Sequence, residues 1–192
     1  MTTILWLVAA FFAQVIAIGY PPVLAFWFII HLNIERWRKV GKRAYWAALA
    51  WPVIGGPLLY WRQEIFSVRR PNPWWVIVLG IVALGLSLRI ASKAGKSISL
   101  RTLVGIPELE PQKNRQPLLQ SGIYSSTRNP VYVAHWLAIL ASAAMTGFAA
   151  NWLLLAGDSL VLPLMVRAEE RELRGRYGAE YEEYTRRVRR FV

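Results

Sequence analysis

The sequence predicts an all-α fold, a polytopic bundle of about five transmembrane helices, and three observations lead to this prediction. Of the 192 residues, 55% are hydrophobic and ten are tryptophan. The charged residues stand in blocks between long apolar runs, which is typical of a membrane protein and not of a soluble domain. The chain has no cysteine, so a disulfide framework, a thiolate nucleophile and a cysteine-ligated metal are excluded.

Five apolar runs approach the length that crosses a hydrocarbon core about 30 Å thick. They cover residues 4–32, 44–61, 74–91, 130–146 and 151–166. The first run is long for one plain helix, and Tyr20, Pro21 and Pro22 interrupt it. Consecutive prolines remove backbone donors, so we expect a kink or a re-entrant break there. One kinked span and two shorter spans remain alternatives.

The basic residues predict the orientation of these spans. If the N-terminus is outside, five spans place 20 of the 23 lysines and arginines in the cytoplasm, as the positive-inside rule requires. The first residues carry no basic region, so we expect no cleaved signal peptide. The net charge of +12 is then a feature of the membrane surface. It suits anionic lipid headgroups, and we expect no nucleic-acid partner.

Two regions are expected along the chain. Residues 1–91 form three N-terminal spans, and residues 92–192 form a cytoplasmic loop, a transmembrane hairpin and a C-terminal tail. The loop, residues 92–127, is polar, and a structured loop of this length is often functional. Apolar tail residues recur on one helical face, which predicts an amphipathic helix that continues from the last span and lies near the headgroups. They are Leu173, Tyr177, Tyr181, Tyr184 and Val188.

Two charged, aromatic-rich motifs flank the predicted hairpin. The first contains Gly122, Tyr124, Arg128, Asn129, Pro130 and Tyr132. The second contains Glu169, Glu170 and Leu173, followed by Arg176, Tyr177, Gly178, Glu180, Tyr181 and Tyr184. Because a hairpin crosses the bilayer and returns, both motifs are expected side by side at one membrane face, where they build a site.

Together the motifs resemble the isoprenylcysteine carboxyl methyltransferase and phospholipid methyltransferase superfamily. The pattern there is G-x-Y-x-x-x-R-H-P-x-Y, a helical hairpin, E-E-x-x-L and then F/Y-G-x-E-Y-x-x-Y. The resemblance covers residues 117–191 and implies a small prokaryotic integral-membrane enzyme of the bacterial or archaeal cytoplasmic membrane. It implies that S-adenosyl-L-methionine binds on the cytoplasmic side and that the acceptor is lipophilic or lipid-linked.

Carried over residue by residue, the resemblance implies a cofactor pocket and three catalytic candidates. The pocket residues are Gly122, Tyr124, Arg128, Asn129, Pro130, Tyr132, Glu169 and Glu170, and His135, which lies outside the motifs, is added as a further candidate for the pocket. The catalytic candidates are Arg128, Glu169 and Glu170. No metal is expected, because only two histidines and no cysteine are present.

The residue types suit this cofactor. Carboxylates can accept hydrogen bonds from ribose hydroxyls or pair with an amine, and arginine can hold a carboxylate. Tyrosine faces attract cations, and a sulfonium is one. Asn129 stands where the pattern has histidine. Because asparagine gains no proton near neutral pH, a binding role replaces an acid–base role there.

Simpler interpretations exist for each candidate. Gly122 and Pro130 can serve only to turn the chain and start a helix, and Arg128 and Tyr132 can be interfacial anchors. The glutamates can be solvated charges that pair with arginines of the tail. The tyrosines of the tail suit packing better than ligand contact.

Two ionisable residues stand inside predicted spans, Asp158 in the last and His135 in the one before. Such a residue is a functional candidate by default. A hydrogen-bonded structural pair is an equal alternative.

Three other functions remain open. A phospholipid N-methyltransferase belongs to the same superfamily. Membrane sterol and steroid reductases, which use NADPH, carry a similar R-H-P-x-Y element near the C-terminus. A non-enzymatic membrane protein that keeps the motifs as a scaffold is the third.

Overall fold

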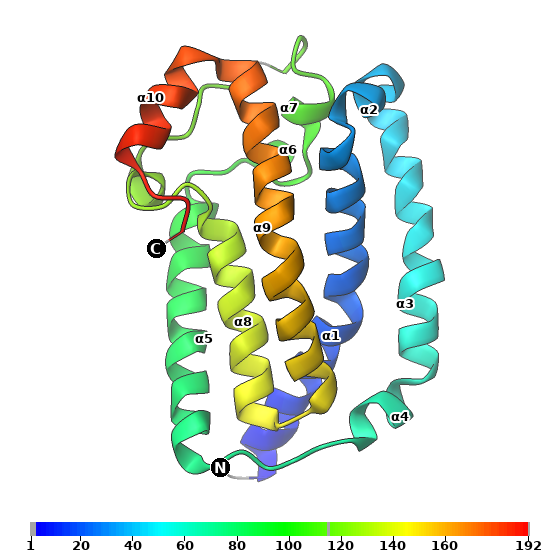
Figure 1. The fold of residues 1–192 in the computed structure, drawn as a ribbon. Coiled ribbons are helices and arrows are strands. Elements are labelled where there is room, and N and C mark those ends of the chain that lie inside the picture. The colour runs from blue at the N-terminus through cyan, green and yellow to red at the C-terminus, as the bar shows by residue number, and fades with distance from the viewer. Residues whose placement is uncertain (1–2, 115, 192) are drawn as a thin grey trace.

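The structure, a computed structural model, describes residues 3–114 and 116–191 (Figure 1). Over these residues the chain is helical with no β-strand, apart from two isolated bridges, so the all-α prediction is confirmed. The helices are α1 Thr3–Leu32, α2 Ile34–Val40, η1 Gly41–Ala50, α3 Trp51–Tyr60, α4 Arg62–Ser67, α5 Trp74–Gly95, α6 Leu100–Leu103, α7 Ile106–Leu109, η2 Gly122–Ser125, α8 Pro130–Thr146, α9 Ala149–Tyr177 and α10 Ala179–Arg187.

Three of these helices, α1, α5 and α9, are long and apolar enough to cross a membrane. A fourth apolar helix, α8, has 17 residues and lies between α5 and α9. Large apolar side chains such as Phe11, Val82 and Leu160 point outward from the long helices. Outward apolar faces of this kind suit contact with lipid. The count of five spans and the outside N-terminus stay predictions.

The first predicted span is one continuous helix. α1 has 30 residues and runs through Pro21 and Pro22 without a re-entrant break, one of the two alternatives expected at these prolines. A proline removes a backbone donor, but neighbouring helices can stabilise a proline-containing membrane helix. In this helix Pro22 is buried, with Gly55 of α3 close beside it. One span is therefore favoured over two.

The second predicted span is helical but irregular. It consists of the 3-10 helix η1 followed by the short helix α3, and together they run alongside α1 in Figure 1. Pro52 and Pro57 lack backbone donors, and two glycines precede Pro57. Glycine and proline are the weakest helix formers, which explains why no single long α-helix forms here.

Small residues allow α5 and α8 to pack closely. A Cβ atom added at Gly80 would lie 2.9 Å from the Ala144 Cβ atom, so the two helices touch nearly backbone to backbone. Nearer the other end of α5, the buried Ser87 hydroxyl donates a hydrogen bond to the Ala134 carbonyl oxygen, at 2.8 Å. Small residues and interhelical hydrogen bonds of this type stabilise helix pairs in membranes.

The helix order brings distant segments to one end of the bundle. α8 and α9 form the predicted hairpin, and their turn lies at the same end as the N-terminus (Figure 1). The opposite end holds α2, α6, α7, α10, the first turn of α8 and the last turns of α9. Both sequence motifs therefore lie at this end, together with the end of α1.

The C-terminal tail differs from the prediction of one continuous helix. α9 ends at Tyr177, and Gly178 adopts φ +54°, a left-handed conformation that glycine reaches without strain. α10 then turns away from α9 (Figure 1). Tyr181, Tyr184 and Val188 are buried against Leu118, Leu173 and Tyr177. The apolar stripe thus packs inside the protein and does not face the headgroups.

Candidate active site

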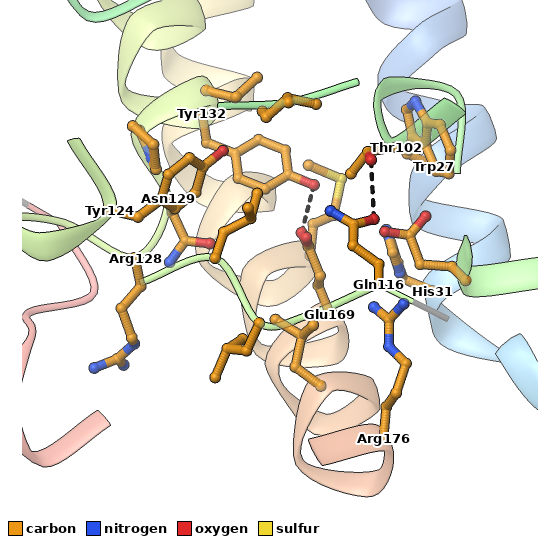
Figure 2. Close-up of a pocket in the computed structure, with 18 of the residues that line it drawn as sticks. Trp27, His31, Thr102, Gln116, Tyr124, Arg128, Asn129, Tyr132, Glu169 and Arg176 are labelled. Atoms are coloured by element: carbon orange, nitrogen blue, oxygen red, sulfur yellow. Dashed lines mark hydrogen bonds between the residues drawn. The ribbon is translucent and has the colours of Figure 1, made fainter. Parts of the chain in front are cut away.

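A cavity of about 320 Å³ opens at the end of the bundle where the two motifs meet (Figure 2). Its wall combines α1, α8, α9 and α10 with the segment that connects α5 to α8. The volume lies at the lower end of the range of small-molecule sites.

One face of α1 forms a long side of this cavity. Tyr20, Val23, Leu24, Trp27 and His31 line it at helical spacing, so their side chains point the same way. From Tyr20 to His31 the helix rises about 16 Å, at about 1.5 Å per residue. The cavity therefore extends from the end of the bundle into its apolar interior.

Glu169 and Tyr132 meet at the cavity wall. The Tyr132 hydroxyl donates a hydrogen bond to Glu169 Oε2 over 2.6 Å, and both side chains line the cavity (Figure 2). Tyr132 comes from the first turn of α8 and Glu169 from the late turns of α9. This bond joins the two motifs directly and uses one carboxylate oxygen, and among the described residues no hydrogen bond is made to Oε1, which can accept one from a ligand.

Glu170 has a different environment from its neighbour. Its side chain is 0% exposed and lies between two arginines, with Arg128 Nη2 at 2.9 Å and Arg190 Nη2 at 2.7 Å. Successive residues on an α-helix point about 100° apart, so only one of the two glutamates can face the cavity. Glu170 thus holds the start of α8 to the end of the tail.

The guanidinium of Arg128 points away from the cavity centre in Figure 2. Besides Glu170, it donates hydrogen bonds to the carbonyl oxygens of Thr185 and Val188. Asn129 donates a side-chain hydrogen bond to the Arg190 carbonyl oxygen at 3.1 Å. Both side chains therefore fasten the tail to the entrance of α8, although parts of each contribute to the cavity wall.

The structure brings most of the predicted pocket residues to the cavity, but not all. Those that line it are Tyr124, Arg128, Asn129, Pro130, Tyr132, His135 and Glu169. Gly122 lies outside the cavity wall and begins η2 with φ +63°, and Glu170 is held in its ion pairs. The catalytic and binding roles themselves stay predictions.

Several wall residues were not predicted from the sequence. Trp27 and His31 come from α1, Thr102 and Gln116 from the connecting segment, and Arg176 from α9. The Thr102 hydroxyl donates to Gln116 Oε1 at 2.9 Å (Figure 2). The spacing of Tyr20, Trp27 and His31 along one face of α1 is the signal that could have pointed to this wall.

Arg176 lines the cavity near Glu169, at the end of the bundle, which is called the polar end of the cavity below. Its Nη2 pairs with Glu172 at 3.0 Å, and Glu172 also pairs with Arg38 of α2. The buried Nε of Arg176 has no hydrogen-bond partner among residues 3–114 and 116–191. A buried donor without a partner is costly, and the Arg176 side chain that carries it also lines the cavity.

Glu108, in α7, borders the same polar end. Burial raises the pKa of the Glu108 carboxyl to about 8, and the Glu169 carboxylate nearby adds to the increase. The folded protein thus holds this proton more tightly than the unfolded chain. The contribution of this group to the free energy of unfolding is therefore lost as the pH rises from the unfolded value of 4.5 to about 8.

We expect Glu108→Gln to remove this pH dependence, since glutamine resembles the protonated form. The melting temperature of the variant in detergent should exceed that of the wild type at pH 9 but not at pH 5. Glu64→Gln, at an exposed position of α4, is the matched control and should follow the wild type at both pH values. Parallel pH curves for Glu108→Gln and wild type would refute the assignment.

Within the part of the chain that the structure describes, no group of three or more histidine, cysteine, aspartate or glutamate side chains is placed to hold a metal ion. Three acidic side chains at this end of the bundle pair with arginine or tyrosine. Glu169, Glu170 and Glu172 all do so.

Comparison with known proteins agrees with this geometry. The family model for phospholipid methyltransferases matches residues 75–180, a range that contains both motifs and the hairpin between them. The cobalt-zinc-cadmium resistance protein CzcN of Cupriavidus metallidurans is 36% identical over 130 residues, or 66% of this chain. The aligned region spans only about half, 55%, of the length of that relative. No solved structure matches.

The family match covers more than half of the chain and agrees with the earlier resemblance of the motifs. With three helices apolar enough to cross a bilayer, it supports a membrane methyltransferase. The chain belongs to the phospholipid methyltransferase family, within the superfamily that also contains the isoprenylcysteine carboxyl methyltransferases.

Proposed function

We propose that the protein is an integral-membrane methyltransferase that uses S-adenosylmethionine and modifies a lipophilic acceptor. One observation carries the proposal: residues of both motifs line a single cavity whose other wall is an apolar membrane helix. A polar donor can enter such a cavity from the end of the bundle, and an acceptor with an apolar body can reach it from the bilayer.

The residues at the polar end fit the groups of this cofactor. Glu169, with one oxygen engaged by Tyr132, is suited to a ribose hydroxyl or an amine, and the unpaired Nε of Arg176 is suited to a carboxylate. The ring of Trp27 provides a π-face for a cation. S-adenosylmethionine would supply an activated methyl group here. The side chains then need only to hold the acceptor in line and exclude water.

The acceptor and the membrane face belong to the proposal as well. The positive-inside bias favours a site that faces the cytoplasm. The acceptor classes that enter this proposal are a carboxylate on a lipidated molecule, a phospholipid amine and a lipophilic hydroxyl or thiol. The Arg128–Glu170–Arg190 ion pairs act in this proposal as positioning groups, because they fix the first turn of α8 and with it Tyr132.

The test is calorimetric binding of S-adenosylhomocysteine to the detergent-purified protein, with NADPH titrated in parallel. We expect binding of the former only, weakened about tenfold or more in Glu169→Gln, because a hydrogen bond to a charged group is worth about 1.5–3 kcal/mol. Glu183→Gln, whose exposed side chain pairs only with Arg187 in the described chain, is the matched control and should bind like the wild type.

Two other binding results contradict the proposed function, and a third contradicts only the role of Glu169. NADPH binding without S-adenosylhomocysteine binding would favour the reductase. Binding of neither compound by folded protein would favour a scaffold. Unchanged affinity in Glu169→Gln would remove Glu169 from the cofactor site while leaving the cofactor assignment in place.

A further inference from the structure

A polar cluster lies at the inner, apolar end of the cavity, away from the polar groups described above. It consists of Tyr20 from α1, His135 from α8 and Asp158 from α9. These three helices pack against one another, so the cluster lies where they converge. The neighbouring wall is apolar and includes Val23 and Met165.

The contacts within this cluster are specific. The Tyr20 hydroxyl donates a hydrogen bond to Asp158 Oδ1 over 3.2 Å. The rings of Tyr20 and His135 meet edge to face, with centroids 5.6 Å apart and planes at 76°. Tyr20 and His135 line the cavity, whereas Asp158 lies behind Tyr20 and is only 1% exposed. The Tyr20 hydroxyl is therefore the group that connects the cavity with the buried carboxyl.

The Asp158 carboxyl uses only one of its two oxygens in a described hydrogen bond. Its second oxygen, Oδ2, is buried and has no hydrogen-bond partner in residues 3–114 and 116–191. A carboxyl inside a membrane helix is costly, and such residues mark functional sites. If it served only to join helices, its second oxygen would be expected to have a partner too.

The arginine side chains that line the cavity do not lie beside Tyr20 and Asp158. Arg128 and Arg176, the two arginines in the described wall, are paired with Glu170 and Glu172. A carboxylate acceptor would therefore meet a carboxyl and a phenol at the inner end, without a guanidinium to balance its charge. An acceptor group that can donate a hydrogen bond and lose its proton on methylation fits this end better.

We propose that Tyr20 and Asp158 form a proton relay for the methyl acceptor, and that the acceptor is a lipophilic molecule with a hydroxyl or thiol group. This inference rests on the proposed methyltransferase function. As the acceptor oxygen or sulfur bonds to the methyl carbon, the bond from that carbon to the sulfonium sulfur breaks and its electron pair stays on sulfur. The acceptor proton moves to Tyr20 Oη, while the hydroxyl proton of Tyr20 moves to the Asp158 carboxylate.

The groups have separate parts in this relay. Tyr20 touches the acceptor, and Asp158 receives the proton and later returns it to solvent. His135 is a positioning residue, because its ring fixes the orientation of the Tyr20 ring. The apolar wall beside Tyr20 accommodates the body of the acceptor and excludes water from the reacting atoms.

Two probes that differ by one proton test the binding half of the inference. Protein saturated with S-adenosylhomocysteine is titrated with 4-octylphenol, which has a hydroxyl, and with its methyl ether, 4-octylanisole, which has none. We expect the wild type to prefer the phenol about three- to tenfold, the worth of one hydrogen bond. Tyr20→Phe should abolish the preference, and Tyr60→Phe, at a position 79% exposed on α3, should keep it.

The Asp158→Asn variant tests the proton-transfer half of the inference. Asp158→Asn can still accept the Tyr20 hydrogen bond but cannot take up a proton, so it should retain the preference for the phenol in binding. Its turnover of 4-octylphenol should fall about 100-fold, the lower end of the general-base contribution. Gly157→Ala changes the neighbouring position, where an added Cβ atom meets nothing within 4 Å, and should keep wild-type turnover.

The possible results distinguish failure of the proton relay from failure of the proposed methyltransferase function. Normal S-adenosylhomocysteine binding with no phenol preference would overturn the relay and leave the methyltransferase in place. Equal weakening of phenol and anisole in Tyr20→Phe would reduce Tyr20 to a packing residue and also overturn it. Failure of the wild type to bind S-adenosylhomocysteine would overturn the proposed function and the relay with it.

Discussion

Glu170→Ala is expected to lower the free energy of unfolding by about 3–5 kcal/mol, the usual cost of removing one partner from a buried ion pair. The substitution leaves the Arg128 side chain, which is 9% exposed, without its carboxylate. It also removes both hydrogen bonds that Arg190 makes to Glu170, at 3.1 and 2.7 Å. Denaturant unfolding of the protein in detergent measures this loss.

An exposed ion pair of the same region provides the control. Arg174 and Glu182 join α9 to α10 at 3.0 Å, with both side chains substantially exposed. Exposed pairs contribute about 0–1 kcal/mol, so Glu182→Ala should be nearly neutral. Equal effects of Glu170→Ala and Glu182→Ala would show that the Arg128–Glu170–Arg190 ion pairs do not hold the tail to α8.

Gly147→Ala is expected to destabilise the α8–α9 turn by about 3 kcal/mol or more, through two effects that add. Gly147 has φ +76°, where an L-residue costs about 1–2 kcal/mol. In addition, a Cβ atom would lie 2.0 Å from the Arg70 carbonyl oxygen, a backbone atom that can move only with its chain. The shift would disturb the hydrogen bond from the Arg70 amide to the Gly147 carbonyl oxygen, which measures 3.0 Å.

Gly157→Ala, ten residues further along in α9, is the matched control. A Cβ atom there meets nothing within 4 Å, and the backbone is helical. Since alanine is the better helix former by about 0.5–1 kcal/mol, this variant should be neutral or slightly more stable. Melting temperatures in detergent compare the two. If Gly147→Ala melted like Gly157→Ala, the tight approach of residue 70 to the turn would be refuted.

The helical class and the hairpin could be predicted because they depend on local properties. Apolar run length and the charges between the runs identify α1, α5 and α8 within a few residues, and they identify the start of α9, which continues 11 residues beyond the predicted span to Tyr177. The irregular η1–α3 segment and the turn at Gly178 depend on how neighbouring helices support a backbone with few donors or a positive φ. The prolines and the glycine mark these positions, but they do not say whether a helix bends, breaks or continues.

The site was predictable only in part, for a different physical reason. Motif spacing brought Tyr132 and Glu169 together as candidates, and both line one cavity, while their roles stay predictions. It could not separate Glu169 from Glu170, since that requires knowing which face of α9 turns inward. It also could not predict Tyr20, whose partner Asp158 is 138 residues away in the chain. A contact of this separation follows from packing and has no local sequence pattern.

The wall that α1 contributes has a consequence for how relatives can diverge. The family match begins at residue 75, so α1 lies wholly outside it, while Tyr132, Glu169 and Arg176 lie within it. The α1 side of the cavity and the side that carries these three residues are thus encoded by separate stretches of the gene. Exchange of the first helix between relatives changes the α1 side, from Tyr20 to His31, and leaves Tyr132, Glu169 and Arg176 in place, so the acceptor preference can evolve without rebuilding the rest of the site.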